Sequence, residues 1–167
     1  MSESILGTII FLTILVMGAF LYIKRDQLTW PGKEMEVIKI CFNRSEDNPS
    51  GDCFTSEVAR AQAEREKGLM FRQSLALDGA MLFVFPDIGF HNFWMKNCLI
   101  PLDIIWLDEN YKIVALVPNN QPCPQTGECP SIDPGVTAKY VLEINAGLAR
   151  KIGLSQGSYF TLKPLDK

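Results

Sequence analysis

Residues 80–117 read AMLFVFPDIGFHNFWMKNCLIPLDIIWLDENYKIVALV, with short runs of aromatic and branched side chains separated by Pro86, Pro101 and an Asp-Glu-Asn turn. Such runs are typical of β-strands, which proline and turn-forming residues bring to an end. We therefore expect strands at residues 80–85, 92–96, 102–107 and 112–117. The last two are separated by a short polar turn and should form a hairpin.

Similar short segments lie on both sides of this stretch. Further strands are predicted at residues 35–42, 54–58, 140–145 and 157–162, and helices at 59–70 and 146–154. Five of the ten prolines fall within residues 118–135, which predicts an irregular loop there. The sequence thus favours an α+β fold, a compact antiparallel β-rich domain or small barrel with two short helices.

An apolar segment precedes this domain. Residues 5–23 contain neither a charged residue nor a proline, and about 20 such residues span a bilayer core as a helix. The preceding residues include Glu3 but no Lys or Arg, which disfavours a cleaved signal peptide. We predict an N-terminal transmembrane anchor at residues 1–24, a juxtamembrane linker at 25–34 and a globular domain at 35–167.

Two features predict opposite orientations of the anchor. Lys24 and Arg25 follow the apolar segment directly, and basic residues favour the cytoplasmic side. The cysteines favour an oxidising compartment, because two pairs are spaced to close short disulfide loops, Cys41 with Cys53 and Cys123 with Cys129. Since large domains translocate largely regardless of two charges, we expect a single-pass protein of the cytoplasmic membrane with an extracytoplasmic domain; a cytoplasmic domain is the alternative.

Composition and motifs exclude several functional classes. The formal net charge is −3 and no cluster of Lys and Arg is present, so a nucleic-acid partner is not expected. Glycine-rich phosphate loops, a G-x-S-x-G elbow and a His-Glu-x-x-His motif are absent from the sequence, and no cofactor is expected. A single histidine and the wide spacing of Cys123 and Cys129 also argue against a metal site.

A few polar residues inside apolar segments are candidates for a site. His91 could act as an acid or base with Asp103 or Glu143, or simply cap a strand. The two carboxylates stand within apolar strands and would need a cationic partner there. The candidates for a polar pocket are therefore His91, Lys96, Asn97, Asp103, Glu143, Arg65 and Arg72. Cys98 is expected to be a buried strand cysteine, and Phe93, Trp94 and Trp106 to belong to the core or line an apolar groove.

Four blocks carry a family resemblance: EREKGLMFRQSL at 64–75, AMLFVF at 80–85, FWMKNCLIPLDIIWLD at 93–108 and KYVLEINAG at 139–147. Together they resemble domain of unknown function family 192, over roughly residues 37–162. The resemblance implies a compact β-rich α+β domain with no assigned activity. In this family a threonine is usual where Cys98 stands, and the loop with Cys123 and Cys129 matches a paired-cysteine loop of exported members.

These observations lead to one functional expectation and two alternatives. We expect a non-enzymatic module, tethered to the membrane by its N-terminal helix, that binds a small ligand, a glycan, a peptide or an envelope protein. The first alternative is a hydrolase or transferase that uses His91 with Asp103 or Glu143 as acid and base. The second is a purely structural envelope subunit, which would expose an apolar patch in place of a polar pocket.

Overall fold

The computed structural model describes residues 35–43, 51–124 and 126–163. The predicted transmembrane anchor and the linker, residues 1–34, lie outside the described residues. Within the described ranges, no helix has the length and apolar character needed to cross a bilayer.

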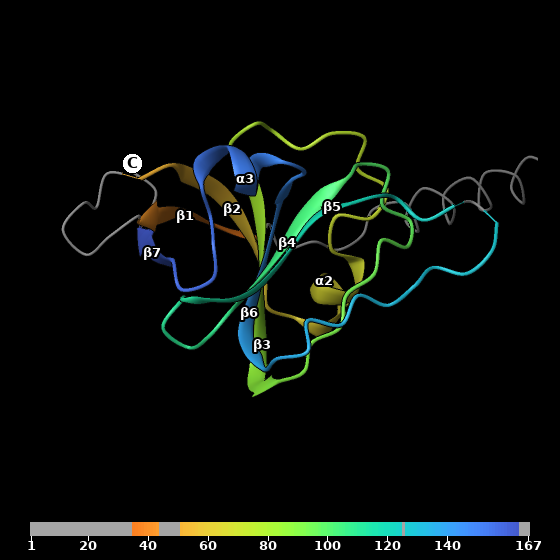
Figure 1. Cartoon of the computed structure of the whole chain (residues 1–167). Coiled ribbons are helices and arrows are strands. Elements are labelled where there is room, and N and C mark those ends of the chain that lie inside the picture. The colour runs from red at the N-terminus through yellow and green to blue at the C-terminus, as the bar shows by residue number, and fades with distance from the viewer. Residues whose placement is uncertain (1–34, 44–50, 125, 164–167) are drawn as a thin grey trace, which may run out of the picture. The chain divides into compact units, whose positions relative to one another are not determined.

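The described residues form one seven-stranded sheet and two short helices (Figure 1). The sheet order is β5-β4-β6-β3-β2-β1-β7, and every adjacent pair is antiparallel except β2 with β3. The predicted β-rich α+β class with two short helices is confirmed. In chain order the elements are β1 Glu36–Asn43, β2 Cys53–Ala59, α2 Gln62–Lys67, β3 Gly79–Gly89, β4 Leu102–Leu107, β5 Ile113–Asn120, β6 Ala138–Asn145, α3 Leu148–Ile152 and β7 Tyr159–Lys163.

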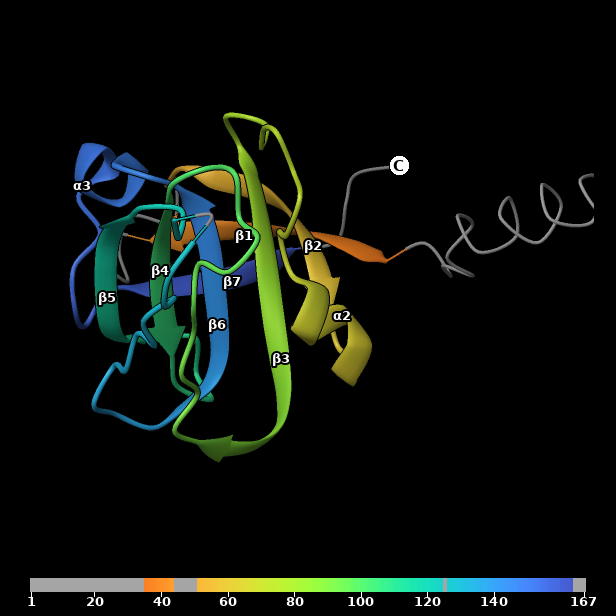
Figure 2. The ribbon, with the colours of Figure 1, turned by 90° about the vertical axis from the view of Figure 1, so that its right-hand side faces the viewer.

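The two outer strands of the sheet meet at one end. The amide of Ile113 donates to the carbonyl of Ser158 at 2.7 Å, and the amide of Phe160 donates to the carbonyl of Tyr111 at 3.0 Å. These bonds join the start of β5 to β7, so the sheet curls into a half-barrel (Figure 2). The curling leaves fewer unpaired strand edges than an open sheet of the same size would have.

Each face of the sheet carries its own apolar cluster, because successive side chains of a strand point to opposite faces. The barrel cluster lies inside the half-barrel and includes Ile40, Phe42, Leu82, Ile105, Leu142, Phe160 and Ala149 of α3. The outer cluster lies on the opposite face and includes Leu69, Met81, Phe83, Met95, Cys98, Ile104, Trp106 and Val141. The helices follow the same division, with α3 and α2 on opposite sides of the sheet (Figure 2).

The strand predicted at residues 92–96 is wrong. This segment makes a single isolated bridge, between Phe93 and Ile132, and otherwise crosses the outer cluster as a loop. Phe93 and Met95 resemble the inward-facing residues of a strand because their side chains pack down onto the sheet, but a ladder of hydrogen bonds does not hold this segment.

The predicted loop at 118–135 begins too early, since β5 continues to Asn120. Pro118 is accommodated because β5 is an outer strand and its register with β4 shifts between Leu102 and Ile104, which forms an irregularity at this position. The predicted helices are also shorter than expected, at Gln62–Lys67 and Leu148–Ile152.

Both predicted cysteine pairs are joined as disulfides in the structure. Cys41 and Cys53 are directly opposite each other on β1 and β2, and Cys123 and Cys129 close the loop after β5. Cys98 is the free, buried cysteine among the described residues.

Candidate functional site

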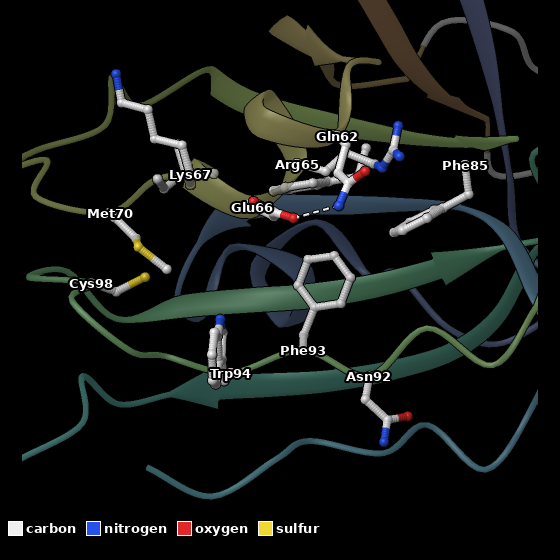
Figure 3. Close-up of a pocket in the computed structure, with 13 residues that line it drawn as sticks. Gln62, Arg65, Glu66, Lys67, Met70, Phe85, Asn92, Phe93, Trp94 and Cys98 are labelled. Atoms are coloured by element: carbon white, nitrogen blue, oxygen red, sulfur yellow. Dashed lines mark hydrogen bonds between the residues drawn. The ribbon is translucent and has the colours of Figure 1, made fainter.

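A groove of about 320 Å³ lies over the outer cluster, between α2 and residues 92–98 (Figure 3). We call it the aromatic groove. Its walls include Phe85, Phe93 and Trp94, and its floor is formed by the buried side chains of Leu69, Phe83 and Cys98. Volumes of this size lie at the lower end of those found for small-molecule sites, which are also mostly apolar with a few polar groups.

One wall of the groove depends on the short helix α2. The Glu64 carboxylate accepts hydrogen bonds from the amides of Arg60 (2.8 Å) and Ala61 (2.7 Å), so it satisfies donors that the start of a helix leaves free. The helix ends at Gly68, whose φ of 46° favours glycine. A Cβ at Gly68 would also lie 3.2 Å from the ring of Phe83, so glycine permits the close approach of the helix end to the groove floor.

The opposite wall is held by packing of aromatic rings. Phe93 packs edge-to-face on Phe83, with ring centroids 5.0 Å apart, and on Trp106 at 5.9 Å. Backbone hydrogen bonds in both directions between Phe93 and Ile132 fix the chain at this point. Trp94, the next residue, is 49% exposed and presents its indole to the groove (Figure 3).

Polar side chains line the rim of the groove. Arg65 places its guanidinium 5.4 Å from the centroid of the Phe85 ring and donates to the carbonyls of Val84 and Arg60. Gln62 donates to the Glu66 carboxylate at 2.8 Å, as the dashed line in Figure 3 shows. A ligand in this groove would therefore meet an apolar interior and a polar edge.

Lys96 and Asn97 lie at one end of the groove. A second hollow of about 430 Å³ adjoins it and is lined by Trp94, Lys96, Asn97, Cys98 and the loop of Cys123 and Cys129. The Lys96 ammonium lies 5.0 Å from the centroid of the Trp94 ring. The Asn97 carbonyl accepts from the amide of Phe71 at 2.8 Å, so Asn97 ties the two walls of the groove together.

Asp103 does not face the groove. Its side chain is fully buried and accepts three backbone hydrogen bonds, from Asn119 (2.7 Å), Gly147 (2.9 Å) and Ala149 (2.8 Å). These donors belong to the end of β5 and to the start of α3. Asp103 therefore joins β4 to two other elements, and its carboxylate is fully engaged by backbone groups.

Glu143 is buried among apolar side chains. Its register neighbours on β3 and β4 are Met81 and Ile104, both of the outer cluster, and the residue is 3% exposed. Burial raises the pKa of its carboxyl to about 8. The pKa of the nearby Cys98 thiol is raised to about 11, mainly by burial and further by the charge of Glu143.

The comparisons with known proteins agree with this description of the domain. The family model DUF192, described as an uncharacterized ACR, matches residues 44–162. The chain belongs to the DUF192 family. No curated protein matches it significantly.

Two solved structures resemble this DUF192 protein. A protein from Sinorhizobium meliloti 1021, described as a proposed transcription regulator, is 28% identical with a TM-score of 0.70, and the match covers 78% of this chain and 97% of that chain. A protein of unknown function from Novosphingobium aromaticivorans DSM 12444 is 30% identical with a TM-score of 0.68, covering 78% of this chain and 89% of that chain. The solved chains therefore consist almost entirely of the matching domain.

His91 is not brought together with either carboxylate in this DUF192 domain. Its ring stacks on Phe85, with centroids 3.6 Å apart, and its Nε2 lies 3.3 Å from the carbonyl of Asp87. In the pairing of β3 with β6, Phe85 follows Val84, which lies opposite Tyr140, and Tyr140 is roughly 10 Å along β6 from Glu143. His91, which stacks on Phe85, is therefore far from the Glu143 carboxyl. Asp103 contributes to the opposite face of the sheet. The His91 carbonyl accepts from the Trp106 indole at 2.7 Å, and burial lowers the pKa of the ring.

The expected cationic partners of the carboxylates are also engaged elsewhere. Arg72 makes a bidentate ion pair with Glu57, which raises the pKa of the guanidinium. Arg65 is directed to backbone carbonyls and to Phe85. Sequence reasoning assumed a salt bridge for Asp103 and Glu143, whereas backbone amides donate to the first and the second lies beside the apolar residues Met81 and Ile104.

Of the seven candidates predicted for a pocket, the structure places Arg65, Lys96 and Asn97 around the aromatic groove and the adjoining hollow. Phe93 and Trp94 line the groove, while Trp106 is fully buried. Sequence reasoning missed Phe85, Met70 and the other α2 side chains, Gln62, Glu66 and Lys67, because no local pattern shows that α2 lies opposite residues 92–98. Among the described residues, no group of three or more His, Cys, Asp or Glu is arranged to hold a metal ion.

Proposed function

We propose that this DUF192 protein is a non-enzymatic binding domain, tethered to the outer face of the cytoplasmic membrane, whose aromatic groove holds the apolar part of a small ligand. The observation that carries this proposal is the groove itself, with its apolar floor and the half-exposed Trp94 at its wall. Figure 3 shows the indole nitrogen of Trp94 directed into the groove, where its N–H can donate to a polar group of the ligand.

Binding is favoured over acid–base catalysis by the placement of the polar groups. His91 stacks on Phe85 away from both carboxylates, and Asp103 already accepts three hydrogen bonds. A candidate general base must reach the proton that it abstracts, directly or through one water. The transcription role ascribed to the Sinorhizobium relative is not carried over, since the net charge of −3 gives no support for nucleic-acid binding.

The groove can be tested with the apolar fluorescent anion 8-anilinonaphthalene-1-sulfonate. The domain, residues 35–167, is suitable because the solved relatives consist of this domain almost alone. We expect saturable binding of one probe per domain, weakened on the order of tenfold in Trp94→Ala because one wall of the groove is lost. Phe90→Ala is the matched control, since Phe90 is 70% exposed and does not line the groove. Equal affinity of the two variants would count against the groove as a binding site. Native mass spectrometry of the purified protein would then be used to detect a natural ligand bound at another place on the domain.

The membrane placement predicts a second result. In cells that express the full chain, protease added to spheroplasts should digest the domain, and non-reduced protein should show both disulfides by mass spectrometry, with one free thiol at Cys98. The reason is that short disulfide loops persist only where the thiols are not kept reduced. If the domain is digested only after the spheroplasts are lysed, and if it has five free thiols, then it lies in the cytoplasm.

A further inference from the structure

The aromatic groove and the adjoining hollow share part of their lining but differ in chemistry. Trp94 and Cys98 line both of them. The floor of the groove is apolar, whereas the hollow is lined by Lys96, Asn97, Glu128 and the disulfide loop. A ligand that lies along Trp94 can therefore place an apolar part in the groove and a polar part in the hollow.

Lys96 supplies a positive charge where the two cavities meet. Its ammonium lies 5.0 Å from the centroid of the Trp94 ring, and the residue lines the hollow. Contact with a ring face orients an ammonium but does not neutralise its charge, as a carboxylate partner would. Its three N–H donors can therefore serve an anionic group that is bound beside Trp94.

Arg65 makes a similar contact with an aromatic ring, but its charge serves the fold. The guanidinium lies 5.4 Å from the centroid of the Phe85 ring, and Figure 3 shows Phe85 and Cys98 at opposite ends of the groove. The guanidinium also donates to the carbonyl of Val84 at 3.2 Å and to that of Arg60. These bonds join α2 to β3, so Lys96 is better placed than Arg65 to bind a ligand.

Asn97 adds amide donors to the hollow. Its side-chain nitrogen lies 3.7 Å from the sulfur of Met70, and a thioether accepts hydrogen bonds only weakly. The Asn97 carbonyl accepts from the amide of Phe71 at 2.8 Å, which fixes the backbone next to Lys96. A carboxylate, sulfonate or phosphate bound in the hollow would be a stronger acceptor for this amide than the thioether is.

Two acids also line these cavities, and they limit the positive charge there. Glu66 lies at the rim of the groove and accepts a hydrogen bond from another side chain of α2. Glu128 is exposed and lines the hollow together with Lys96. The cations of the two linings are Arg65, Lys67 and Lys96, so three cations stand against two acids. The excess is positive, although the formal net charge of the chain is −3.

We propose that the ligand of this site is an anionic amphiphile, with its apolar part in the aromatic groove and its acidic group in the adjoining hollow beside Lys96. This inference rests on the proposed function and makes its ligand class specific. The acidic group accepts from the Lys96 ammonium and the Asn97 amide, while the apolar part packs on Trp94. The groove and the hollow, of about 320 and 430 Å³, are of the size that holds a small molecule.

The test compares two fluorescent probes with the same ring system in the domain of residues 35–167. The anion 8-anilinonaphthalene-1-sulfonate carries a sulfonate, and neutral N-phenyl-1-naphthylamine has hydrogen in its place. We expect Lys96→Gln to weaken binding of the anionic probe roughly fivefold at low salt, and Glu128→Gln to strengthen it roughly twofold. Both variants should bind the neutral probe as the wild type does, because it has no charge for either residue to attract or repel.

Lys151→Gln is the matched control, since Lys151 is exposed on α3 and lines neither cavity. It should bind both probes like the wild type. If Lys96→Gln and Lys151→Gln bind the anionic probe equally well while Trp94→Ala binds both probes less tightly, the anionic ligand class is wrong and the groove remains a binding site. If Trp94→Ala leaves the affinity for both probes unchanged, the proposed function fails, and this inference fails with it.

Discussion

Glu143→Gln is expected to raise the free energy of unfolding by about 3 kcal/mol near neutral pH and by as much as about 5 kcal/mol above pH 8, while changing it little near pH 4.5. The folded domain holds the Glu143 proton up to a pKa of about 8, whereas the model value is 4.5. Between these two values the unfolded chain has released a proton that the folded domain keeps. The stability of the wild type must therefore fall as pH rises through this window and level off above it. Glutamine has nearly the same shape and carries no such penalty.

The measurement is urea denaturation of wild type and variant at about pH 5, 7 and 8.5. Glu109→Gln is the matched control, because Glu109 is exposed in the turn between β4 and β5, and its curve should run parallel to that of the wild type. If the Glu143→Gln curve also runs parallel to the wild type, the carboxyl is not held protonated in the folded domain.

Much of the fold follows from local patterns in the sequence. The strands at 102–107, 112–117 and 140–145 could be predicted because β-branched and aromatic residues stand between prolines and polar turns. The half-barrel could not be predicted to the same detail. It depends on hydrogen bonds between Tyr111 or Ile113 and residues 158–160, and such non-local pairings leave no trace in any short window of sequence.

The two buried acids show why the site was harder to predict than the fold. Asp103 and Glu143 look alike in sequence, since each interrupts an apolar strand. Their environments differ because Asp103 points to the face that α3 covers, where backbone amides are free, whereas Glu143 points to the opposite face among methionine and cysteine side chains. Strand periodicity distinguishes the two faces of a sheet but does not tell which helix covers each one.

Asp103→Ala is expected to lower the free energy of unfolding by about 3 to 5 kcal/mol, a large part of the 5 to 15 kcal/mol typical of a domain. Three amides, those of Asn119, Gly147 and Ala149, would lose their acceptor, and Asp103 is fully buried, so water cannot readily replace it. Asp133→Ala is the matched control. Its carboxylate also accepts a backbone hydrogen bond, from Gly135 at 2.8 Å, but the residue is exposed, and the loss should be about 1 kcal/mol or less.

Asp103→Asn refines this prediction because it distinguishes structural support from chemistry. The Asp103 Oδ1 accepts from Asn119 and Gly147, which an amide oxygen can still do, while Oδ2 accepts from Ala149, which an amide nitrogen cannot. We therefore expect an intermediate loss of stability, with faster hydrogen exchange at Ala149 than at Asn119, and unchanged probe binding in the aromatic groove on the other face. A variant as stable as the wild type, or one that is folded but no longer binds the probe, would show that Asp103 does more than join β4 to β5 and α3.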